Sequence, residues 1–251
     1  MLTVSDLERA LSIAGLSAPV FADEVTSSTN ATALSLAEDG APEWTLVAAG
    51  HQTGGRGRLG RLWRDVEGRA LLFSLLLRPE WLSPERAGLI PLAVGWAMCG
   101  AATDATGLRV GCKWPNDLVL GGSKVGGILV ESRVSGNVLR CAVAGVGVNL
   151  DPPPDVAGAG GLGDVDAVSL LGTFLRSFRS LYRPDEQAFA EAIVAEYPSR
   201  SVTIGREVEA TRSDGSKLRG RAVAVHRDGS LALEAPTGLL RVDVADVQHL
   251  R

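Results

Sequence analysis

The sequence predicts an α+β protein that is divided into a large and a small domain. Helix-like and strand-like segments are interspersed through the first 200 residues, in no regular alternation. From Ser201 onward the pattern changes to short strands of alternating residues, separated by turns. A chain of 251 residues is long enough for two domains of unequal size. We therefore expect a large domain over residues 1–199 and a small domain over residues 200–251.

Start and stop signals predict the helices of the large domain. Ser5-Asp6-Leu7-Glu8 has the form of a capping box, and Gly15 ends the helix that it begins. A proline in the first turn, Pro84, opens a long apolar helix. The helices expected on these grounds cover residues 5–14, 30–38, 83–103, 167–182 and 184–197.

Apolar and β-branched runs predict the strands between these helices. They cover residues 20–25, 44–49, 70–77, 108–114, 124–131 and 139–148. The last two are expected to pair as a hairpin across Ser135-Gly136-Asn137. Residues 151–166 have no periodicity, so we expect a mobile loop there.

The small domain is predicted from closely spaced strand patterns. They cover residues 202–211, 217–226, 230–235 and 238–244, and the turns between them cover residues 213–216, 227–229 and 236–238. Strands of this length and spacing indicate a small closed barrel.

Composition and charge exclude several classes of function. Apolar residues make up 45% of the chain and charged residues 22%, as in ordinary globular proteins. The net charge of −4 gives no overall basic field for nucleic acid or an anionic membrane, so arginines that bind anions must act locally, inside a cleft. No signal peptide is recognised, and no uncharged apolar run reaches about 18 residues. We therefore expect a cytoplasmic protein.

The number and spacing of the cysteines are consistent with the reducing cytoplasm. Cys99, Cys112 and Cys141 form neither a disulfide framework nor a zinc-binding pattern. Each lies in an apolar stretch and is expected to be a small buried hydrophobic residue.

The first segment with chemical content is the stretch GGRGRLGRLW at residues 54–63. Gly55, Gly57 and Gly60 match the dinucleotide-binding pattern, but no helix follows them, so a Rossmann-type site is rejected. Four arginines crowd nine residues here: Arg56, Arg58, Arg61 and Arg64. Like charges at this density repel unless an anion compensates them. A solvated basic turn is the alternative, but we favour a loop that closes over an anionic ligand.

The second segment is KWPND at residues 113–117, followed by KVGG at residues 124–127. Trp114-Pro115 favours extended backbone and Asn116-Asp117 favours a turn, so an ordinary β-turn between two strands is one interpretation. The other is a binding site, because glycines within a strand leave room for a ligand to approach closely. In that case Lys113, Asp117 and Lys124 could converge on one site.

Together these segments resemble biotin protein ligase, the family of biotin–[acetyl-CoA-carboxylase] ligases. The matching segments are STN at 28–30, QTGGRGRLGRLW at 52–63, KWPNDL at 113–118, KVGGILVE at 124–131 and GVGVNL at 145–150. The resemblance implies a class II aminoacyl-tRNA-synthetase-like catalytic domain, which is a mixed sheet flanked by helices, followed by a small SH3-like β-barrel. It also implies an ATP-dependent ligase that activates biotin as biotinyl-5′-AMP and transfers it to a lysine of a biotin carrier domain, such as that of acetyl-CoA carboxylase.

The resemblance also implies roles for individual residues. Those implied in catalysis are Lys124, Arg58, Asp117 and Lys113. Those implied in binding biotin are Ser28, Thr29, Asn30, Gln52, Gly55, Arg56, Arg58, Lys124, Gly127 and Gly145. Those implied in holding ATP or the adenylate are Arg56, Arg58, Arg61, Trp63, Lys124, Asn116 and Asn149. Mg²⁺ is implied as the ion that accompanies ATP, and no metal ligand is assigned.

The expected partners are biotin, ATP and the carrier domain. Some members of the family carry an N-terminal winged-helix domain, but too few residues precede the first expected strand here to form one. We therefore expect no DNA binding and no membrane association. A monomer and a homodimer both remain open.

Two other functions are weighed against this one. A lipoate–protein ligase or octanoyltransferase would share the fold, but Gly-Arg-Gly-Arg together with Lys-Trp-Pro-Asn-Asp is typical of the biotin branch. A nucleic-acid reader would need a basic domain and aromatic platforms. The chain is acidic and contains only 5% aromatic residues, which argues against that class.

Overall fold

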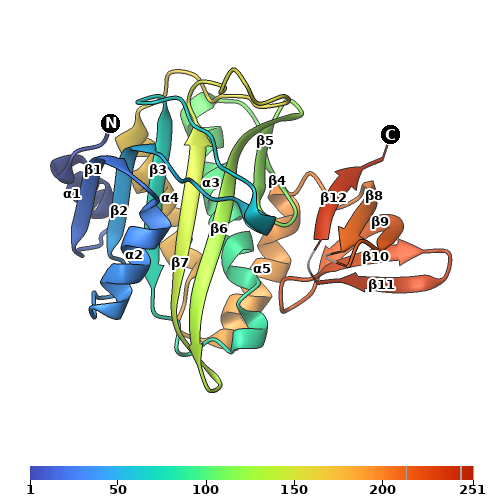
Figure 1. Ribbon diagram of the computed structural model, residues 1–251. Helices are drawn as coiled ribbons and strands as arrows, with labels where there is room; N and C mark the ends of the chain where they lie inside the picture. The colour runs from blue at the N-terminus through green and yellow to red at the C-terminus, as the bar shows by residue number, and fades with distance from the viewer. Residues whose placement is uncertain (213, 244, 251) are drawn as a thin grey trace.

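The structure, a computed structural model, describes residues 1–212, 214–243 and 245–250. It contains a seven-stranded mixed sheet and a five-stranded antiparallel sheet (Figure 1). The strand order of the larger sheet is β1-β2-β3-β7-β6-β5-β4, in which β1 and β2 are parallel and the other neighbours are antiparallel. Its strands are β1 (Val20–Thr26), β2 (Leu46–Gln52), β3 (Ala70–Leu77), β4 (Val110–Lys113), β5 (Asp117–Leu120), β6 (Ser123–Ser135) and β7 (Val138–Asn149).

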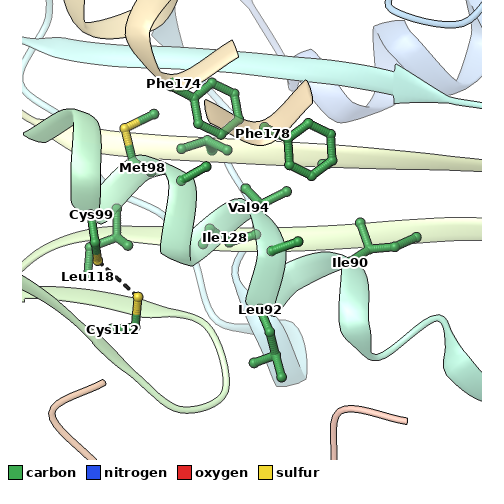
Figure 2. Close-up of a cluster of buried hydrophobic side chains, with 14 of the residues drawn as sticks. Ile90, Leu92, Val94, Met98, Cys99, Cys112, Leu118, Ile128, Phe174 and Phe178 are labelled. Atoms are coloured by element: carbon green, nitrogen blue, oxygen red, sulfur yellow. Dashed lines mark hydrogen bonds between the residues drawn. The ribbon is translucent and has the colours of Figure 1, made fainter. Parts of the chain in front are cut away.

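Helices cover one face of this sheet. They are α1 (Val4–Ile13), α3 (Leu89–Thr106), α4 (Ala167–Leu181) and α5 (Glu186–Arg200). The central strand β3 contributes alternate side chains to the core beneath them, because successive side chains of a strand point to opposite faces. Phe73 of β3 packs on Phe174 of α4 with ring centroids 5.3 Å apart. Figure 2 shows Phe174 and Phe178 beside the apolar side chains of α3.

The helix α3 packs in the core beneath the seven-stranded sheet. Together with the turn before it, Pro84–Thr106, it is long and apolar enough to cross a membrane by length and composition. Within the structure, however, 67% of its most apolar window is buried by the rest of the protein. Its apolar character is therefore explained by packing between the sheet and α4.

The cysteines are buried, as the sequence predicts. Cys99 of α3 and Cys112 of β4 face each other with their sulfur atoms 3.1 Å apart (Figure 2). Burial raises the pKa of Cys99 well above its ordinary value, and the hydrogen bond with Cys112 acts in the same direction. This thiol therefore stays protonated at neutral pH.

The opposite face of the sheet is covered only in part. The helix α2 (Thr29–Glu38) packs Ala33 and Leu34 against Val47, Leu76 and Val143 of the sheet. Figure 1 shows that the segment after β2 crosses in front of β7 and β6 towards β4. The space between this segment and the sheet is where the candidate site lies.

Several elements differ from the sequence-based expectation. The capping box forms earlier than expected, since Asp6 N donates to Thr3 Oγ1 at 3.2 Å and Thr3 N donates to Asp6 Oδ2 at 2.9 Å. The expected helix 83–103 is divided into a 3₁₀ turn, Pro84–Arg86, and α3, which runs on to Thr106. Asp117, expected in a turn, instead begins the unexpected strand β5, which pairs with β4 and β6.

The C-terminal sheet has the strand order β11-β10-β9-β8-β12. Its strands are β8 (Glu207–Arg212), β9 (Lys217–Val225), β10 (Leu231–Ala235), β11 (Gly238–Val242) and β12 (Ala245–His249). The sheet is SH3-like, and within the described ranges no strand pairing joins its edge strands β11 and β12, so closure into a barrel stays a prediction. The strand spacing predicted four strands here, whereas the structure has five, because β12 was not expected. The expected turn residue Ser213 and strand end Val244 lie outside the described residues.

Trp114 joins the two sheets. Its side chain is only 2% exposed. Its backbone N donates to Thr203 Oγ1 at 3.0 Å, and its indole Nε1 donates to Gly229 O at 3.0 Å. Both N–H donors of this large buried residue are thus satisfied by residues beside the C-terminal sheet, which fixes that sheet against the KWPND segment.

Candidate active site

A cavity of about 320 Å³ lies where the large sheet, the loop after β2 and strand β12 meet. Both segments singled out in the sequence contribute to it. The predicted site residues that line it are Ser28, Thr29, Asn30, Gln52, Arg56, Arg58, Arg61, Trp63, Lys113, Asn116, Asp117, Lys124, Gly127 and Gly145. The structure therefore brings together residues that lie up to about a hundred positions apart in the chain.

Glycines of β6 and β7 form the floor of this cavity. Gly127 pairs with Gly147 across the two strands. A Cβ atom at Gly147 would lie 2.6 Å from Trp63 Cε2, and a Cβ atom at Gly145 would overlap Asn30 Oδ1. Only glycine lets the indole and the carboxamide lie this close to the sheet.

Polar side chains beside this floor satisfy one another. Gln52 Oε1 accepts hydrogen bonds from Thr29 N at 2.8 Å and Thr29 Oγ1 at 3.2 Å. The buried Ser74 hydroxyl lies 2.8 Å from Thr29 Oγ1 and 2.7 Å from Asn30 Oδ1. Asn30 Nδ2 donates to Glu131 Oε2 at 2.8 Å. No hydrogen bond among the described residues uses Gln52 Nε2, so this donor remains for a ligand.

The glycine–arginine segment folds back on itself as a narrow loop. Trp63 N donates to Gly55 O at 2.9 Å, and Gly57 N donates to Arg61 O at 2.7 Å. A Cβ atom at Gly55 would lie 3.0 Å from Trp63 O. Gly55 therefore lets the two arms of the loop pack together, and it is not among the residues that line the cavity.

Three arginines of this loop each contact a different element of the protein. The contacts are Arg56 Nη2 to Glu131 Oε2 of β6 at 3.1 Å, Arg58 Nη1 to Asn116 Oδ1 at 3.3 Å, and an ion pair between Arg61 and Asp246 of β12. Burial lowers the pKa of Arg58, while the nearby carboxylates of Asp246 and Asp117 oppose this shift. An arginine keeps its charge in any case, so Arg58 is a partly desolvated cation at the cavity wall.

An ion pair between Lys124 and Asp117 lies at the centre of the second segment. Lys124 Nζ is 2.5 Å from Asp117 Oδ1. Lys113 is the register partner of Asp117 across β4 and β5, which brings a second ammonium group to the same region. Asn116 Nδ2 donates to Ile128 O at 2.8 Å and holds the turn against β6.

Asn149, a predicted nucleotide-binding residue, lies under the loop at residues 151–166 and does not line the cavity. Its side chain is 3% exposed, and its Nδ2 donates to Gly160 O at 3.2 Å. The same loop pairs with the backbone of Lys124, through Gly160 N to Lys124 O at 2.8 Å and Lys124 N to Gly158 O at 2.9 Å. Asn149 thus supports a segment that is attached to Lys124.

Some residues of the site were not predicted from the sequence. Gly147 could have been found, because it alternates with Gly145 on one strand and so shares its face. Ser74 is the single polar residue in the apolar run at residues 70–77, which is a weaker signal. Nothing in the sequence indicated Asp246, since its ion pair with Arg61 depends on how strand β12 docks against the loop. Among the residues that the structure describes, no group of three or more His, Cys, Asp or Glu side chains could hold a metal ion.

Comparison with known protein families assigns the chain. The family described as "Biotin/lipoate A/B protein ligase family" matches residues 22–149, about half of the chain. The chain belongs to the biotin/lipoate A/B protein ligase family. The "Biotin protein ligase C terminal domain" family matches residues 203–250, which include the five-stranded sheet.

Several ligases of this family are similar over most of the chain. The "Bifunctional ligase/repressor BirA" of Bacillus subtilis is 31% identical over 90% of this chain and 72% of its own. The "Biotin--[acetyl-CoA-carboxylase] ligase" of Paracoccus denitrificans is 34% identical over 88% of this chain and 97% of its own. The R40G mutant of the Aquifex aeolicus biotin protein ligase, solved in complex with biotin, has a TM-score of 0.73 at 26% identity, covering 93% of this chain and 98% of its own.

Proposed function

We propose that this protein catalyses the ATP-dependent attachment of biotin to a lysine of a biotin carrier domain. In the first step a carboxylate oxygen of biotin attacks the α-phosphorus of ATP, and pyrophosphate leaves. In the second step the lysine amine attacks the carbonyl carbon of biotinyl-5′-AMP and loses a proton, and AMP leaves. The observation that carries this proposal is a single cavity that combines a glycine-floored pocket with a cluster of arginine and lysine side chains.

The pocket beside α2 is proposed to hold the head group of biotin. Gln52 Nε2 remains available as a donor, and the side chain of Ser28 is 5% exposed at the cavity wall. Asn30 already uses its amide in bonds with Ser74 and Glu131. We therefore assign Asn30 to shaping the pocket, together with Gly145, and Gln52 to binding the ligand directly.

The cationic side of the cavity is proposed to hold the phosphates of ATP. Phosphoryl transfer needs positioning and stabilisation of charge more than covalent participation by the protein. Arginine supplies forked donors that suit phosphate oxygens, and lysine supplies a compact charge. The loop at residues 54–63 closes this side, and by excluding water it would protect the mixed anhydride from hydrolysis.

Lys124 and Asp117 are proposed to act in sequence. Before ATP binds, the carboxylate of Asp117 neutralises Lys124 at 2.5 Å. Negative charge that develops on the α-phosphate would draw the Lys124 ammonium towards it. Asp117 would then be free to accept a hydrogen bond from the incoming amine, which must lose a proton when it attacks.

The remaining elements of the proposal concern organisation. We divide the chain near residue 200, into a catalytic domain that ends with α5 and a C-terminal domain that begins before β8. The C-terminal domain supports the site through Asp246, which lines the cavity and pairs with Arg61. Mg²⁺ is proposed to enter as the ATP complex, and the cytoplasm is proposed as the compartment.

The experiment is to incubate the protein with biotin, Mg²⁺-ATP and a purified biotin carrier domain, and to weigh the carrier by mass spectrometry. We expect the carrier to gain one biotinyl group on a single lysine. When ATP or Mg²⁺ is left out, the mass of the carrier should stay that of the unmodified protein. A parallel reaction with lipoate and a lipoyl domain tests the related activity of the same fold. Modification of the lipoyl domain without modification of the biotin carrier would overturn the proposal.

A further inference from the structure

Glu131, which the steps above do not use, joins the two halves of the cavity. It lies on β6, and its Oε2 accepts hydrogen bonds from Asn30 Nδ2 at 2.8 Å and from Arg56 Nη2 at 3.1 Å. One carboxylate oxygen therefore contacts both Asn30, which lines the pocket, and the arginine loop.

The Asn30 side of this contact is rigid. Asn30 is 4% exposed, and its Nδ2 donates to Leu129 O at 3.2 Å as well as to Glu131. Its Oδ1 accepts from the Ser74 hydroxyl at 2.7 Å. The amide cannot turn without leaving buried polar groups unsatisfied, which is costly. Glu131 is thus attached to a fixed point at the start of α2.

On the Arg56 side of the contact, most hydrogen-bond donors of the guanidinium are not used among the described residues. A guanidinium carries five N–H donors, and within the described structure a single nitrogen, Nη2, contacts Glu131. Arg56 also lines the cavity. The pair can therefore hold the guanidinium at the cavity wall and still leave other donors for an anionic ligand.

The exposure of this ion pair argues for a positional role. The side chain of Arg56 is 48% exposed and that of Glu131 is 24% exposed. Ion pairs this accessible contribute little to folding stability. Holding a flexible arginine in place before the ligand arrives, however, reduces the entropy that is lost on binding.

We propose that Glu131 is a positioning residue that holds Arg56 over the acyl-adenylate, so that the intermediate is retained until the acceptor amine arrives. This inference rests on the proposed function. It predicts that loss of the carboxylate charge loosens the loop while the pocket beneath it stays intact.

The test is the Glu131→Gln variant, which keeps an oxygen to accept the bond from Asn30 but removes the charge that pairs with Arg56. We expect biotinyl-5′-AMP to leave the enzyme about fivefold faster, as measured with labelled biotin in a chase experiment. Biotinylation of bystander lysines on serum albumin should rise with it. The thermal midpoint and the KM for biotin should stay close to those of the unaltered protein. If Glu131 only stabilised the fold or the pocket, its substitution would lower the thermal midpoint or raise the KM.

Two further variants make the result specific. Glu38→Gln removes another exposed ion pair, with Arg133 at 3.6 Å, and should leave the release rate unchanged. Arg56→Gln should accelerate release by itself, and adding Glu131→Gln to it should have no further effect. An unchanged or slower release from Glu131→Gln, or an equal acceleration in the Arg56→Gln background, overturns the proposal. Failure of the unaltered protein to form any adenylate would instead overturn the proposed function on which it rests.

Discussion

The two walls of the cavity differ in how their polar groups are satisfied. On the wall formed by the start of α2 and by β3, called the sheet wall below, Thr29, Ser74 and Asn30 are buried and bond to one another. On the wall formed by the loop at residues 54–63 and the start of β6, called the loop wall below, Lys124 and Arg61 are 44% and 66% exposed, and each pairs with a single carboxylate. A buried network with every group satisfied is rigid and selects a ligand by shape. Half-exposed ion pairs can instead exchange one anion for another, which suits a reaction in which charge moves.

The largest expected effect is on the loop wall, at Lys124. Lys124→Ala removes the cation that is proposed to follow the developing charge, so biotin-dependent pyrophosphate exchange should fall by about a hundredfold to a thousandfold. The control is Lys217→Ala, which breaks an ion pair with Glu209 in the C-terminal sheet and should leave the exchange rate unchanged. A near-normal rate in Lys124→Ala would show that the charge on this wall is not used in activation.

The next effect tests the rigidity of the sheet wall, at Gly145. Gly145→Ala places a methyl group on Asn30 Oδ1, so either the strand or the amide must move. We expect biotin affinity to fall about tenfold, with a loss of about 1–3 kcal/mol in the free energy of unfolding. Calorimetry and urea denaturation measure the two quantities.

A second substitution shows whether the clash is the cause. Asn30→Ala removes the atom that the new methyl group would meet. In that background Gly145→Ala should reduce biotin affinity much less, because the effects of substitutions at two contacting residues are not additive. An equal loss in both backgrounds would mean that the sheet wall is not fixed by the contact between these two residues.

An effect of similar size is expected at Arg58, on the loop wall. Arg58→Gly removes a partly desolvated cation and its bond to Asn116, so the loop should hold the adenylate less tightly. Release of biotinyl-5′-AMP should accelerate about tenfold, since hydrogen bonds to charged groups are among the stronger ones. Streptavidin detection of biotin on bystander lysines gives a second readout. An unchanged release rate would show that loop closure does not depend on this residue.

The sequence predicted elements of the large domain that carry their own local signals. The strand at residues 70–77 has the predicted bounds, and the hairpin of β6 and β7 forms across the predicted turn. Short strands such as β5 and β12 were missed, because they are defined by their partners and not by their own pattern. Closure of the C-terminal sheet into a barrel cannot be derived from strand spacing for a related reason, since closure depends on twist and register over the whole sheet.

The candidate site shows the same division. Lys113, Asp117 and Lys124 belong to one local motif, so their convergence could be proposed from the sequence. The contact of Arg61 with Asp246 joins the loop after β2 to strand β12 and follows only from how the two sheets dock. Gly145 was predicted to lie against the ligand, whereas the structure shows that its missing Cβ first of all makes room for Asn30. A motif thus indicates which residues belong to a site before it indicates what each one contacts.

The docking of the C-terminal sheet behind the loop wall involves a histidine. His249 Nε2 lies 3.2 Å from Thr203 Oγ1, which also accepts the hydrogen bond from Trp114 N. Burial lowers the pKa of His249, and the charges of Lys113 and Arg206 lower it further. The folded protein therefore disfavours the protonated imidazole.

The smallest expected effect follows from this shift in the pKa of His249. Because the folded state binds the proton less tightly than the unfolded state, stability is full above about pH 6.5 and decreases as the pH falls towards the lowered pKa. His249→Gln should reduce the drop in thermal midpoint between about pH 7.5 and about pH 5.5. His226→Gln, a change at the histidine that directly follows β9, should retain the full drop. If both variants respond to pH like the unaltered protein, then the docking of the C-terminal sheet behind the loop wall does not depend on the neutral form of His249. The difference between the two walls would then not extend beyond the loop to the C-terminal sheet.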